Sequence, residues 1–355
     1  MGKFFAKLLL AALLLFGAWL AWALLGKVDP HGPKFVLLRP GSSARHIAAE
    51  LQSAGVIHSS YAFLLAQLIG GGSLKAGEYE FAAPATVFAV RSRLVHGDVY
   101  FHSVVIPEGY TLYDIAAAIG ESGLASRQEF VVAAYSDLSL IRDIAPEAPS
   151  LEGYLFPDTY RFTRTQNVHD LLAVMVRRFR KAATDAGLES NCSQATAATA
   201  ALSRAHSPGV SASSPVPCTL HRVVTLASVI EKETAVAEER PIVASVYYNR
   251  LRAGMPLQAD PSVIYAALVN GQYQGAIHRS DLQSDSPYNT YRHPGLPPGP
   301  IASPGSASLV AALHPATTDF LYFVSDSQGS HRFARTLEEH EQNVSAYRRA
   351  LARAR

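Results

Sequence analysis

The chain is short of charge and nearly lacks cysteine. Its 355 residues hold 31 Lys and Arg against 29 Asp and Glu, so only 17 % are charged and the net charge is +2, whereas an ordinary soluble domain has roughly 25 % charged residues. A balance this close to neutral argues against a nucleic-acid-binding protein, which needs a basic face. Two cysteines are too few for a disulfide scaffold, and they lack the spacing of metal ligands. We therefore expect no metal, no organic cofactor and no nucleic-acid partner.

Apolar residues take the place of the missing charges. They make up 48 % of the chain, which is too much for a disordered protein and too little for a protein that spans a membrane many times. The length leaves room for about two globular domains at roughly 100 to 200 residues each. One membrane segment fits beside them.

One uncharged run, Leu8–Gly26 (LLLAALLLFGAWLAWALLG), is a candidate for that segment, because a helix needs about 20 apolar residues to cross a bilayer. Lys3 and Lys7 precede the run, whereas Lys27 behind it is offset by an aspartate. The positive-inside rule then places residues 1–7 in the cytoplasm and the rest of the chain outside. We expect an uncleaved anchor. A cleaved signal peptide is the alternative, but the run exceeds a signal core of about 7 to 15 residues.

A pattern of strand, Pro/Gly turn, Ser or Thr cap, helix and Gly stop occurs twice after a polar linker at 27–34. The first copy opens with Phe35–Leu38 and ends at Gly55, and the second opens with Val104–Ile106 and ends at Gly123. Repetition of this kind reflects how a core is assembled and carries no function by itself.

Two further short strands are expected between the copies, at Gly77–Phe81 and Val99–Phe101. We therefore predict a small α+β module over 35–145, built from the units 35–103 and 104–145. A different region starts at about residue 151.

This second region, 151–355, opens with the aromatic and turn-rich LEGYLFPDTY, and we expect a helix at 168–187. The segment 187–218 is rich in Ala, Ser, Thr and Pro, so we predict a flexible surface insertion. Its Cys192 and Cys218 either pair in an oxidising compartment or both stay free, because sequence alone does not place their Cα atoms within bonding range.

The strongest local pattern is the apolar helix predicted over His221–Thr234 (HRVVTLASVIEKET). On a helical wheel Glu233 shares the face of Leu226 and Ile230. Glu231 points about 160° away, towards the more polar side. A carboxyl held against an apolar face loses hydration, so its pKa rises and it can act as a general acid near neutral pH. The alternative is a solvated helix end, where a lone Glu more often lies.

Segments rich in Tyr, Asn, Gln, Pro and Gly follow this helix, and we predict them to be loops. They lie at 246–251, 255–262, 286–291 and 295–305. Rigid walls of amide, hydroxyl and aromatic groups suit a sugar chain, whose C–H faces rest on rings. A set of well-formed turns is the alternative.

The order of these segments closely resembles the YceG-like family of endolytic murein transglycosylases. The motifs that carry the resemblance are PEGYT at 107–111, LEGYLFPDTY at 151–160, ASVIEKET at 227–234, NRL at 249–251, GMPLQADPSVIY at 254–265, SPYNTY at 286–291, GLPPGPIASPG at 295–305, LYFV at 321–324 and HRF at 331–333, then Thr336, His340 and Asn343. They cover nearly the whole chain, which departs from the family mainly in its long insertion before Cys218.

The resemblance implies an α+β protein with a single N-terminal transmembrane helix at 8–26, a LysM-like module and an α+β catalytic domain. It implies cleavage of the β-1,4 bond between N-acetylmuramic acid and N-acetylglucosamine in nascent peptidoglycan strands, with a 1,6-anhydro end left behind. The muramyl 6-hydroxyl attacks its own anomeric carbon, so one carboxyl serves first as acid and then as base. Ordinary glycosidases instead use two carboxyls about 5 to 9.5 Å apart.

The family's catalytic glutamate corresponds to the second Glu of EKET, which is Glu233, and Glu231 is the fallback. Further motif residues are inferred to line the sugar groove, namely Gln258, Asp260, Tyr288, Asn289, Thr290, Tyr291, Glu152 and Tyr160. For each of these the alternative is a polar side chain that shapes its own loop. The 35–103 unit either grips glycan or only sets the height of the active site.

The expected location is the inner (cytoplasmic) membrane, with the catalytic part in the periplasm. Expected partners are peptidoglycan glycan strands and the membrane, and the resemblance leaves open which peptidoglycan synthases or division proteins the enzyme meets. Two other functions stay open: a non-catalytic wall-binding scaffold, and a muramidase that hydrolyses the bond with Glu233 and a second carboxylate, Asp260 or Glu238.

Overall fold

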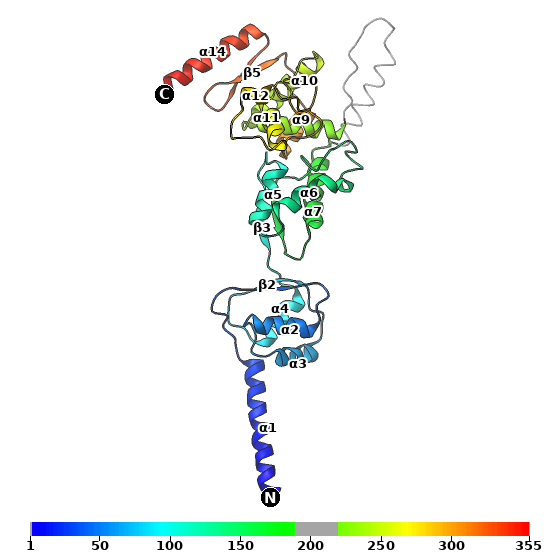
Figure 1. Ribbon diagram of the computed structural model, residues 1–355, viewed down its shortest axis with the longest axis vertical. Coiled ribbons are helices and arrows are strands. Elements are labelled where there is room, and N and C mark those ends of the chain that lie inside the picture. Colours follow the sequence, from blue (N-terminus) through cyan, green and yellow to red (C-terminus); the bar gives the residue numbers. More distant parts are fainter. Residues whose placement is uncertain (1, 189–218, 355) are drawn as a thin grey trace. The chain divides into compact units, whose positions relative to one another are not determined.

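The computed structural model describes residues 2–188 and 219–354 (Figure 1). Nearly all of the predicted insertion, with both cysteines, lies outside these residues. The chain divides into two compact units: unit 1 comprises residues 1–104 and 160–167, and unit 2 comprises residues 105–159 and 168–355. Both mix helices with small sheets, so the expected mixture of helix and sheet is confirmed.

Unit 1 begins with helix α1 (Gly2–Leu25), which carries the predicted apolar run. Its residues Lys3–Leu25 are long and apolar enough to cross a membrane. The last turn of α1 enters the core of unit 1, where Ala23 is fully buried. Trp22 in the same turn stacks on His58 with ring centroids 4.0 Å apart.

The predicted linker at 27–34 is partly held against unit 1. Val28 and Ala85 exchange two backbone hydrogen bonds, Val28 N to Ala85 O at 2.9 Å and Ala85 N to Val28 O at 3.1 Å. Pro30 is buried as well. The polar composition of 27–34 and its Pro and Gly residues predict a linker, but they do not predict this pairing.

The rest of unit 1 places three short helices beside a two-stranded antiparallel sheet. The elements are β1 (Lys34–Leu38), α2 (Ala44–Ser53), α3 (Ser60–Gly70), β2 (Gly77–Phe81) and α4 (Val87–His96). The side chains of Ser43, Ser59 and Thr86 each accept a backbone N–H at the start of a helix, which satisfies a donor that the helix cannot.

Strand β3 (His102–Val105) pairs with β4 (Thr159–Phe162). The predicted strand at Val99–Phe101 is wrong, because β3 starts only at His102. Tyr100 N does donate to Glu78 O at 2.6 Å, but this single bond does not extend into a ladder.

Both predicted copies of the strand-turn-helix pattern have the expected local structure. In the second copy Thr111 caps α5 (Leu112–Glu121) in a capping box with Asp114. Gly55 and Gly123 follow the two helices with φ of +70° and +68°, a conformation that glycine adopts without strain.

The two copies do not form one module, because the second packs into unit 2. Gly109 N donates to Ser303 O at 2.9 Å, and Ser303 N donates to Tyr110 O at 2.8 Å. The PEGYT turn is therefore bound to the 295–305 loop, far along the chain, rather than to residues 35–103.

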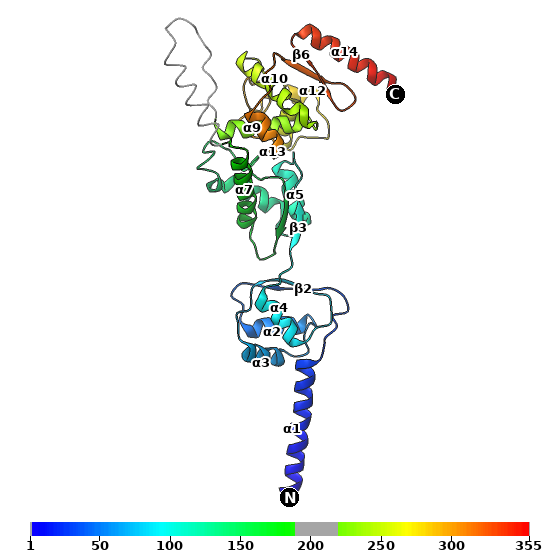
Figure 2. The same ribbon diagram turned by 180° about the vertical axis from the view of Figure 1, so that it is seen from behind.

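Unit 2 is mostly helical (Figure 2). After α5 its elements are α6 (Arg127–Ser136), α7 (Val168–Asp185), α9 (Leu220–Glu233), α10 (Arg240–Arg252), α11 (Asp260–Val269), α12 (Arg279–Leu282), α13 (Ser306–Leu313), β5 (Tyr322–Ser325), β6 (His331–Ala334) and α14 (Leu337–Ala354). Short 3-10 helices lie at Leu138–Leu140 and Ala237–Glu239. Strands β5 and β6 form an antiparallel hairpin.

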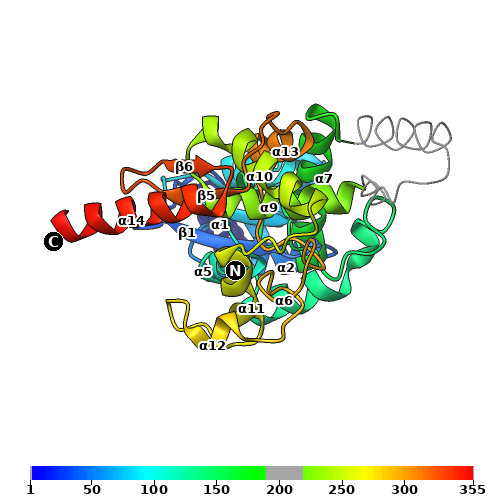
Figure 3. The same cartoon turned by 90° about the horizontal axis from the view of Figure 1, so that it is seen from above.

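Helix α9 lies at the centre of unit 2, in contact with α10, α11 and α13 (Figure 3). Every residue from Leu220 to Ile230 except Arg222 is buried. The polar side of this helix is therefore reduced to Arg222, which is half-buried, and Lys232, which is exposed. The side chain of Glu231, expected on that side, is only 6 % exposed.

One of the predicted loops is helical, and a second ends in a helix. Residues 246–251 lie within α10 and residues 260–262 begin α11. Pro241 and Pro261 occupy the first turns of these helices, where proline is favoured. The high content of Tyr, Asn and Pro is thus misleading for these residues, whereas 286–291 and 295–305 are loops as predicted.

Candidate functional site

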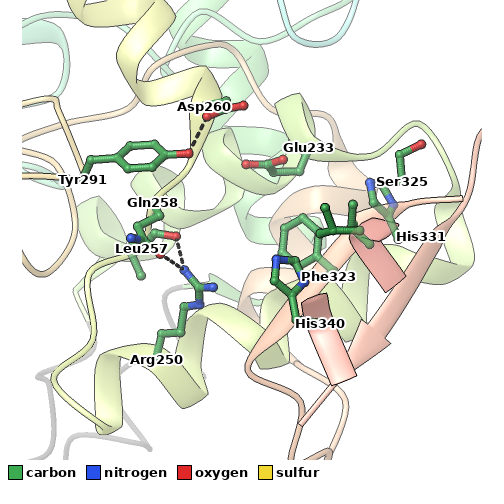
Figure 4. Close-up of a pocket in the computed structure, with 12 residues that line it drawn as sticks. Glu233, Arg250, Leu257, Gln258, Asp260, Tyr291, Phe323, Ser325, His331 and His340 are labelled. Atoms are coloured by element: carbon green, nitrogen blue, oxygen red, sulfur yellow. Dashed lines mark hydrogen bonds between the residues drawn. The ribbon is translucent and has the colours of Figure 1, made fainter. Parts of the chain in front are cut away.

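A pocket of about 420 Å³ lies in unit 2 where α9 ends (Figure 4). Helices α10 and α14, the turn before α11, the 286–291 loop and the β5–β6 hairpin supply its other walls. The lining residues are Glu233, Arg250, Leu257, Gln258, Asp260, Tyr291, Phe323, Val324, Ser325, His331, His340 and Val344.

Glu233 is the last residue of α9, and its carboxyl belongs to the pocket lining. Its Oε1 accepts a hydrogen bond of 2.6 Å from the hydroxyl of Tyr247 in α10. Burial raises the pKa of Glu233 to about 7. The Tyr247 bond and the positive charge of Arg250 oppose this rise, whereas the negative charge of Asp260 adds to it. The carboxyl can therefore hold and release a proton near neutral pH.

Arg250 fixes one wall of the pocket by bonding to main-chain carbonyls and to the side-chain amide of Gln258. Its Nη1 donates to Leu257 O at 2.9 Å and to Gln258 Oε1 at 3.3 Å, and its Nε donates to Leu321 O at 2.7 Å. The guanidinium also lies 5.2 Å from the ring centroid of Tyr322. One buried cation thus ties α10 to the turn before α11 and to the approach to β5.

Gln258 adopts a left-handed backbone with φ of +50°, a conformation that costs a residue other than glycine about 1–3 kcal/mol. Its N–H donates to Thr290 O at 3.2 Å, and its side chain accepts from Arg250. Strain of this kind persists only where neighbours enforce it. It keeps the Gln258 side chain at the pocket.

Asp260 and Tyr291 form a hydrogen-bonded pair in the pocket. The hydroxyl of Tyr291 donates to Asp260 Oδ1 at 2.6 Å. Burial, together with this bond to an anionic acceptor, raises the pKa of Tyr291 above its ordinary value. Tyr291 therefore stays a hydroxyl donor.

His331 and Glu239 make a second buried acid-base pair, whose imidazole lines the pocket. Glu239 accepts from His331 N at 2.8 Å and from His331 Nδ1 at 2.7 Å, and Thr234 Oγ1 donates to it at 3.1 Å. Burial favours the neutral carboxyl, but these bonds outweigh it and lower the pKa of Glu239. Because Glu239 takes the Nδ1 hydrogen, Nε2 is the nitrogen of His331 left for other partners.

Asn289 and Thr290, predicted to bind sugar, are buried behind the pocket wall. Asn289 is fully buried, and its Nδ2 donates to three carbonyl oxygens between residues 281 and 284. Thr290 Oγ1 accepts from Ala259 N at 2.9 Å. Asn289 is thus engaged with backbone, and Thr290 with backbone and with the hydroxyl of Ser262 at 2.8 Å, and both hold the loop that carries Tyr291.

Glu152, Tyr160 and Tyr288 do not line the pocket. Glu152 is 1 % exposed and its carboxylate accepts from Leu112 N. Burial raises its pKa to about 8. Tyr160 is buried in β4 of unit 1 and stacks on Phe162, and the ring of Tyr288 packs on that of Tyr265.

The structure separates the two glutamates of EKET. Glu231 accepts from Arg240 Nη2 at 3.2 Å and from Gly305 N at 3.0 Å, inside unit 2 and away from the pocket lining. Glu238, a candidate second carboxylate, is exposed and does not line the pocket.

Sequence reasoning missed Tyr247, Arg250, Glu239 and His331. Tyr247 and Arg250 lie three residues apart, so a helical reading of VYYNRL places them on one face. The Glu239–His331 pair spans 92 residues, and no local pattern signals it.

A concave site that holds a carboxyl titrating near neutral pH, on a rigid helical scaffold, is typical of an enzyme that uses general acid catalysis. The model of the YceG-like family matches residues 36–346, and the chain belongs to this family.

Three relatives illustrate the similarity. An endolytic murein transglycosylase of Bacillus subtilis (strain 168) is 34 % identical over 324 residues, covering 86 % of this chain and 82 % of the relative. One of Streptococcus pneumoniae serotype 2 is 29 % identical over 351 residues, and these span 90 % of this chain but 60 % of the longer relative. The crystal structure of a yceG-like protein from Listeria monocytogenes matches with a TM-score of 0.56 and 31 % identity, over 87 % of this chain and 98 % of that one.

Proposed function

We propose that the chain is a membrane-anchored endolytic lytic transglycosylase of peptidoglycan. It cleaves the β-1,4 bond between N-acetylmuramic acid and N-acetylglucosamine in nascent strands and so limits their elongation. The observation that carries the proposal is the carboxyl of Glu233, buried in a pocket with a pKa of about 7. The names of the curated relatives support the same activity.

In the proposed reaction Glu233 acts twice. Its protonated form gives the proton to the glycosidic oxygen as the bond from that oxygen to the muramyl anomeric carbon breaks. The muramyl 6-hydroxyl then forms the new bond to that carbon, and the Glu233 carboxylate takes the hydroxyl proton. The products are a free N-acetylglucosamine hydroxyl and a 1,6-anhydro end, and the carboxyl returns to its protonated form.

Gln258, Asp260 and Tyr291 are the proposed sugar contacts, since they offer amide, carboxylate and hydroxyl groups at the pocket. Asn289, Thr290, Tyr288 and Glu152 are proposed to support these walls from behind. Tyr160 has no proposed sugar contact.

The test is cleavage of uncrosslinked glycan strands by the purified chain, with products read by mass spectrometry. We expect anhydro-ended fragments from the wild type and a loss of about 10²–10⁴-fold in rate for Glu233→Gln, the usual contribution of general acid-base catalysis. Glu238→Gln is the matched control, because Glu238 is exposed and outside the pocket lining. Binding without cleavage by the wild type would instead indicate a wall-binding scaffold.

A muramidase is the second candidate, because the carboxylate of Asp260 lines the same pocket as Glu233. Cleavage in isotopically labelled water distinguishes the two. A hydrolase places solvent oxygen in a new reducing end, whereas the proposed transglycosylase takes none.

We also propose a location and a role for the N-terminal part. Helix α1 anchors the chain in the inner membrane with its N-terminus in the cytoplasm, so that the catalytic pocket faces the periplasm. The 35–103 segment is proposed to act as a LysM-like module that grips glycan or sets the height of the pocket. Peptidoglycan synthases and division proteins are the candidate protein partners.

A further inference from the structure

Helix α3 of unit 1 presents an exposed apolar face. Tyr61 is 78 % exposed, Leu68 is 81 % exposed and Ile69 is 68 % exposed. Outside α1, no other large apolar side chain in the described part of the chain is as exposed as these three. Positions 61, 65 and 68 follow helical spacing, so Leu65 shares the face. The sequence of α3, SYAFLLAQLIG, contains no charged residue.

This face lies beside the end of the membrane-spanning helix. Helix α3 contacts α1 directly, and Figures 1 and 2 both show it next to the C-terminal end of α1. His58, two residues before α3 begins, stacks on Trp22 of α1. The relation between the two helices is therefore set by packing inside unit 1.

The length of α1 places its C-terminal end at the lipid–water boundary. The 23 residues Lys3–Leu25 extend about 34 Å at 1.5 Å per residue, slightly more than a hydrocarbon core of about 30 Å. Trp22, in the last turn, then lies at the headgroup level that tryptophan and tyrosine prefer. Helix α3, packed beside that turn, lies at the same level.

No free tether separates unit 1 from the membrane. Ala23 is part of the core of unit 1, Gly26 N donates to Trp22 O at 2.8 Å, and Val28 pairs with Ala85. A Cβ at position 26 would collide with the carbonyl oxygen of Trp22, so this close exit from the helix needs glycine. Unit 1 consequently cannot lift away from the bilayer without losing packed contacts.

A cation lies at the end of α3, where lipid phosphates would meet it. Arg91 of α4 donates through Nε to Gln67 Oε1 at 3.0 Å, and its guanidinium bonds the carbonyl of Gly71. Basic side chains next to a membrane surface are attracted to anionic headgroups.

We propose that the exposed face of α3, formed by Tyr61, Leu65, Leu68 and Ile69, lies in the headgroup layer of the membrane that α1 crosses. The inference rests on the proposed anchoring by α1. Lipid is the occupant because the face continues from a helix already in the bilayer. Apolar area buried there, plus the attraction of Arg91 to headgroups, holds unit 1 flat on the surface.

The test uses full-length protein in nanodiscs of phosphatidylethanolamine and phosphatidylglycerol, with Cys192 and Cys218 replaced by Ser. An environment-sensitive fluorophore is attached to Leu68→Cys, to Leu14→Cys in α1 or to Phe35→Cys in β1. Phe35 is the matched control, because it is an exposed apolar residue of unit 1 that lies on the sheet. Quenching by lipids with nitroxides at shallow or deep positions reports the depth of each probe.

We expect a blue-shifted emission at position 68 and loss of its fluorescence with the shallow quencher, deep quenching at position 14 and neither effect at position 35. A probe at 68 that behaves like the one at 35, with 14 still deep in lipid, would overturn the inference and leave the anchor intact. Failure at 14 as well would remove the anchoring on which it rests. A blue shift at 68 without quenching by either lipid indicates a protein on this face, a second copy included, and also overturns the inference.

Discussion

Two neighbours of Glu233 shift its pKa in opposite directions. The hydroxyl of Tyr247 donates to the carboxylate and stabilises the charged form, whereas the negative charge of Asp260 opposes that form. Since the protonated form is the proposed acid, cleavage falls as the pH rises through about 7, the pKa of Glu233. The pH dependence of the cleavage rate therefore reports how these two contacts shift the pKa of Glu233.

Tyr247→Phe removes the stabilising bond, so the pKa of Glu233 rises and the falling limb of the cleavage profile moves to higher pH. Asp260→Asn removes the repulsion and moves the limb to lower pH, with a loss of rate if Asp260 also binds sugar. The measurement is the initial rate of anhydro-end formation between pH 5 and 9. Tyr248→Phe is the matched control, because its hydroxyl bonds Ala312 O instead. If the falling limb lay at the same pH in Tyr247→Phe and in wild type, the assignment of this limb to Glu233 would be contradicted.

A second residue-scale prediction concerns Glu239, whose pKa is lowered in the folded chain. A carboxylate of this kind stabilises the fold above its unfolded pKa of about 4.3, and that stability is lost as the pH falls through its folded pKa. Glu239→Gln should lower the free energy of unfolding by about 1–3 kcal/mol at pH 7, since it loses charged hydrogen bonds. The difference from wild type should shrink below pH 4, as measured by urea unfolding. Exposed Glu238→Gln should change little at either pH.

How much of the site the sequence predicts depends on the range of the interactions. The wheel and the EKET motif place Glu233 on the correct face, because both depend on residues within two turns. The pair of Glu239 and His331, and the burial of Asn289, arise from contacts between distant segments. No local periodicity carries that information.

At the scale of elements, α9 shows how tertiary pairing overrides a helical wheel. Helices α10 and α13 pack against it, and Glu231, predicted on the more polar side, is buried there with its charge paired to Arg240. Glu108 also lies 4.0 Å from Arg240. Composition predicts loops at 246–251, inside α10, and at 255–262, whose last three residues begin α11, although proline in a first turn also favours a helix start.

Arg240→Met should destabilise unit 2 by about 3–5 kcal/mol, because it leaves the buried carboxylate of Glu231 without its partner. Adding Glu231→Gln should restore part of this loss, since the unpaired charge is then removed. The measurement is a double-mutant cycle in urea. Arg252→Met, at an exposed position of the same helix, is the control, with an expected change of about 0.5 kcal/mol or less. An additive cycle would show that the two side chains are not coupled.

At the scale of the whole molecule, the boundary between the two units differs from the boundary that the repeat pattern predicts. The two copies fold alike locally, yet the second copy binds the 295–305 loop and belongs to unit 2. Local propensity determines each strand-turn-helix, but the choice of neighbour depends on long-range backbone pairing. Sequence symmetry alone therefore misplaces the boundary.

The packing of α1 into unit 1 predicts an effect of truncation. A chain that starts at residue 23 keeps Ala23 and the pairing of Val28 with Ala85, whereas one that starts at residue 33 loses both. The shorter chain should unfold unit 1 with a free energy lower by about 1–3 kcal/mol, from two hydrogen bonds and lost burial. Calorimetry of the two soluble chains measures this. If unit 1 melted equally in the two chains, residues 23–32 would be a free linker. As a control, the two chains should cleave glycan at the same rate, because cleavage belongs to unit 2.

The joint at Gly26 also has a consequence for direction. With α1 anchored as proposed, the helix and unit 1 turn together about the membrane normal, because the last turn of α1 packs into the core of unit 1. A protein that binds one side of α1 inside the bilayer would then fix the orientation of unit 1 about the membrane normal. Contacts made inside the lipid would in this way orient unit 1, although they do not touch it.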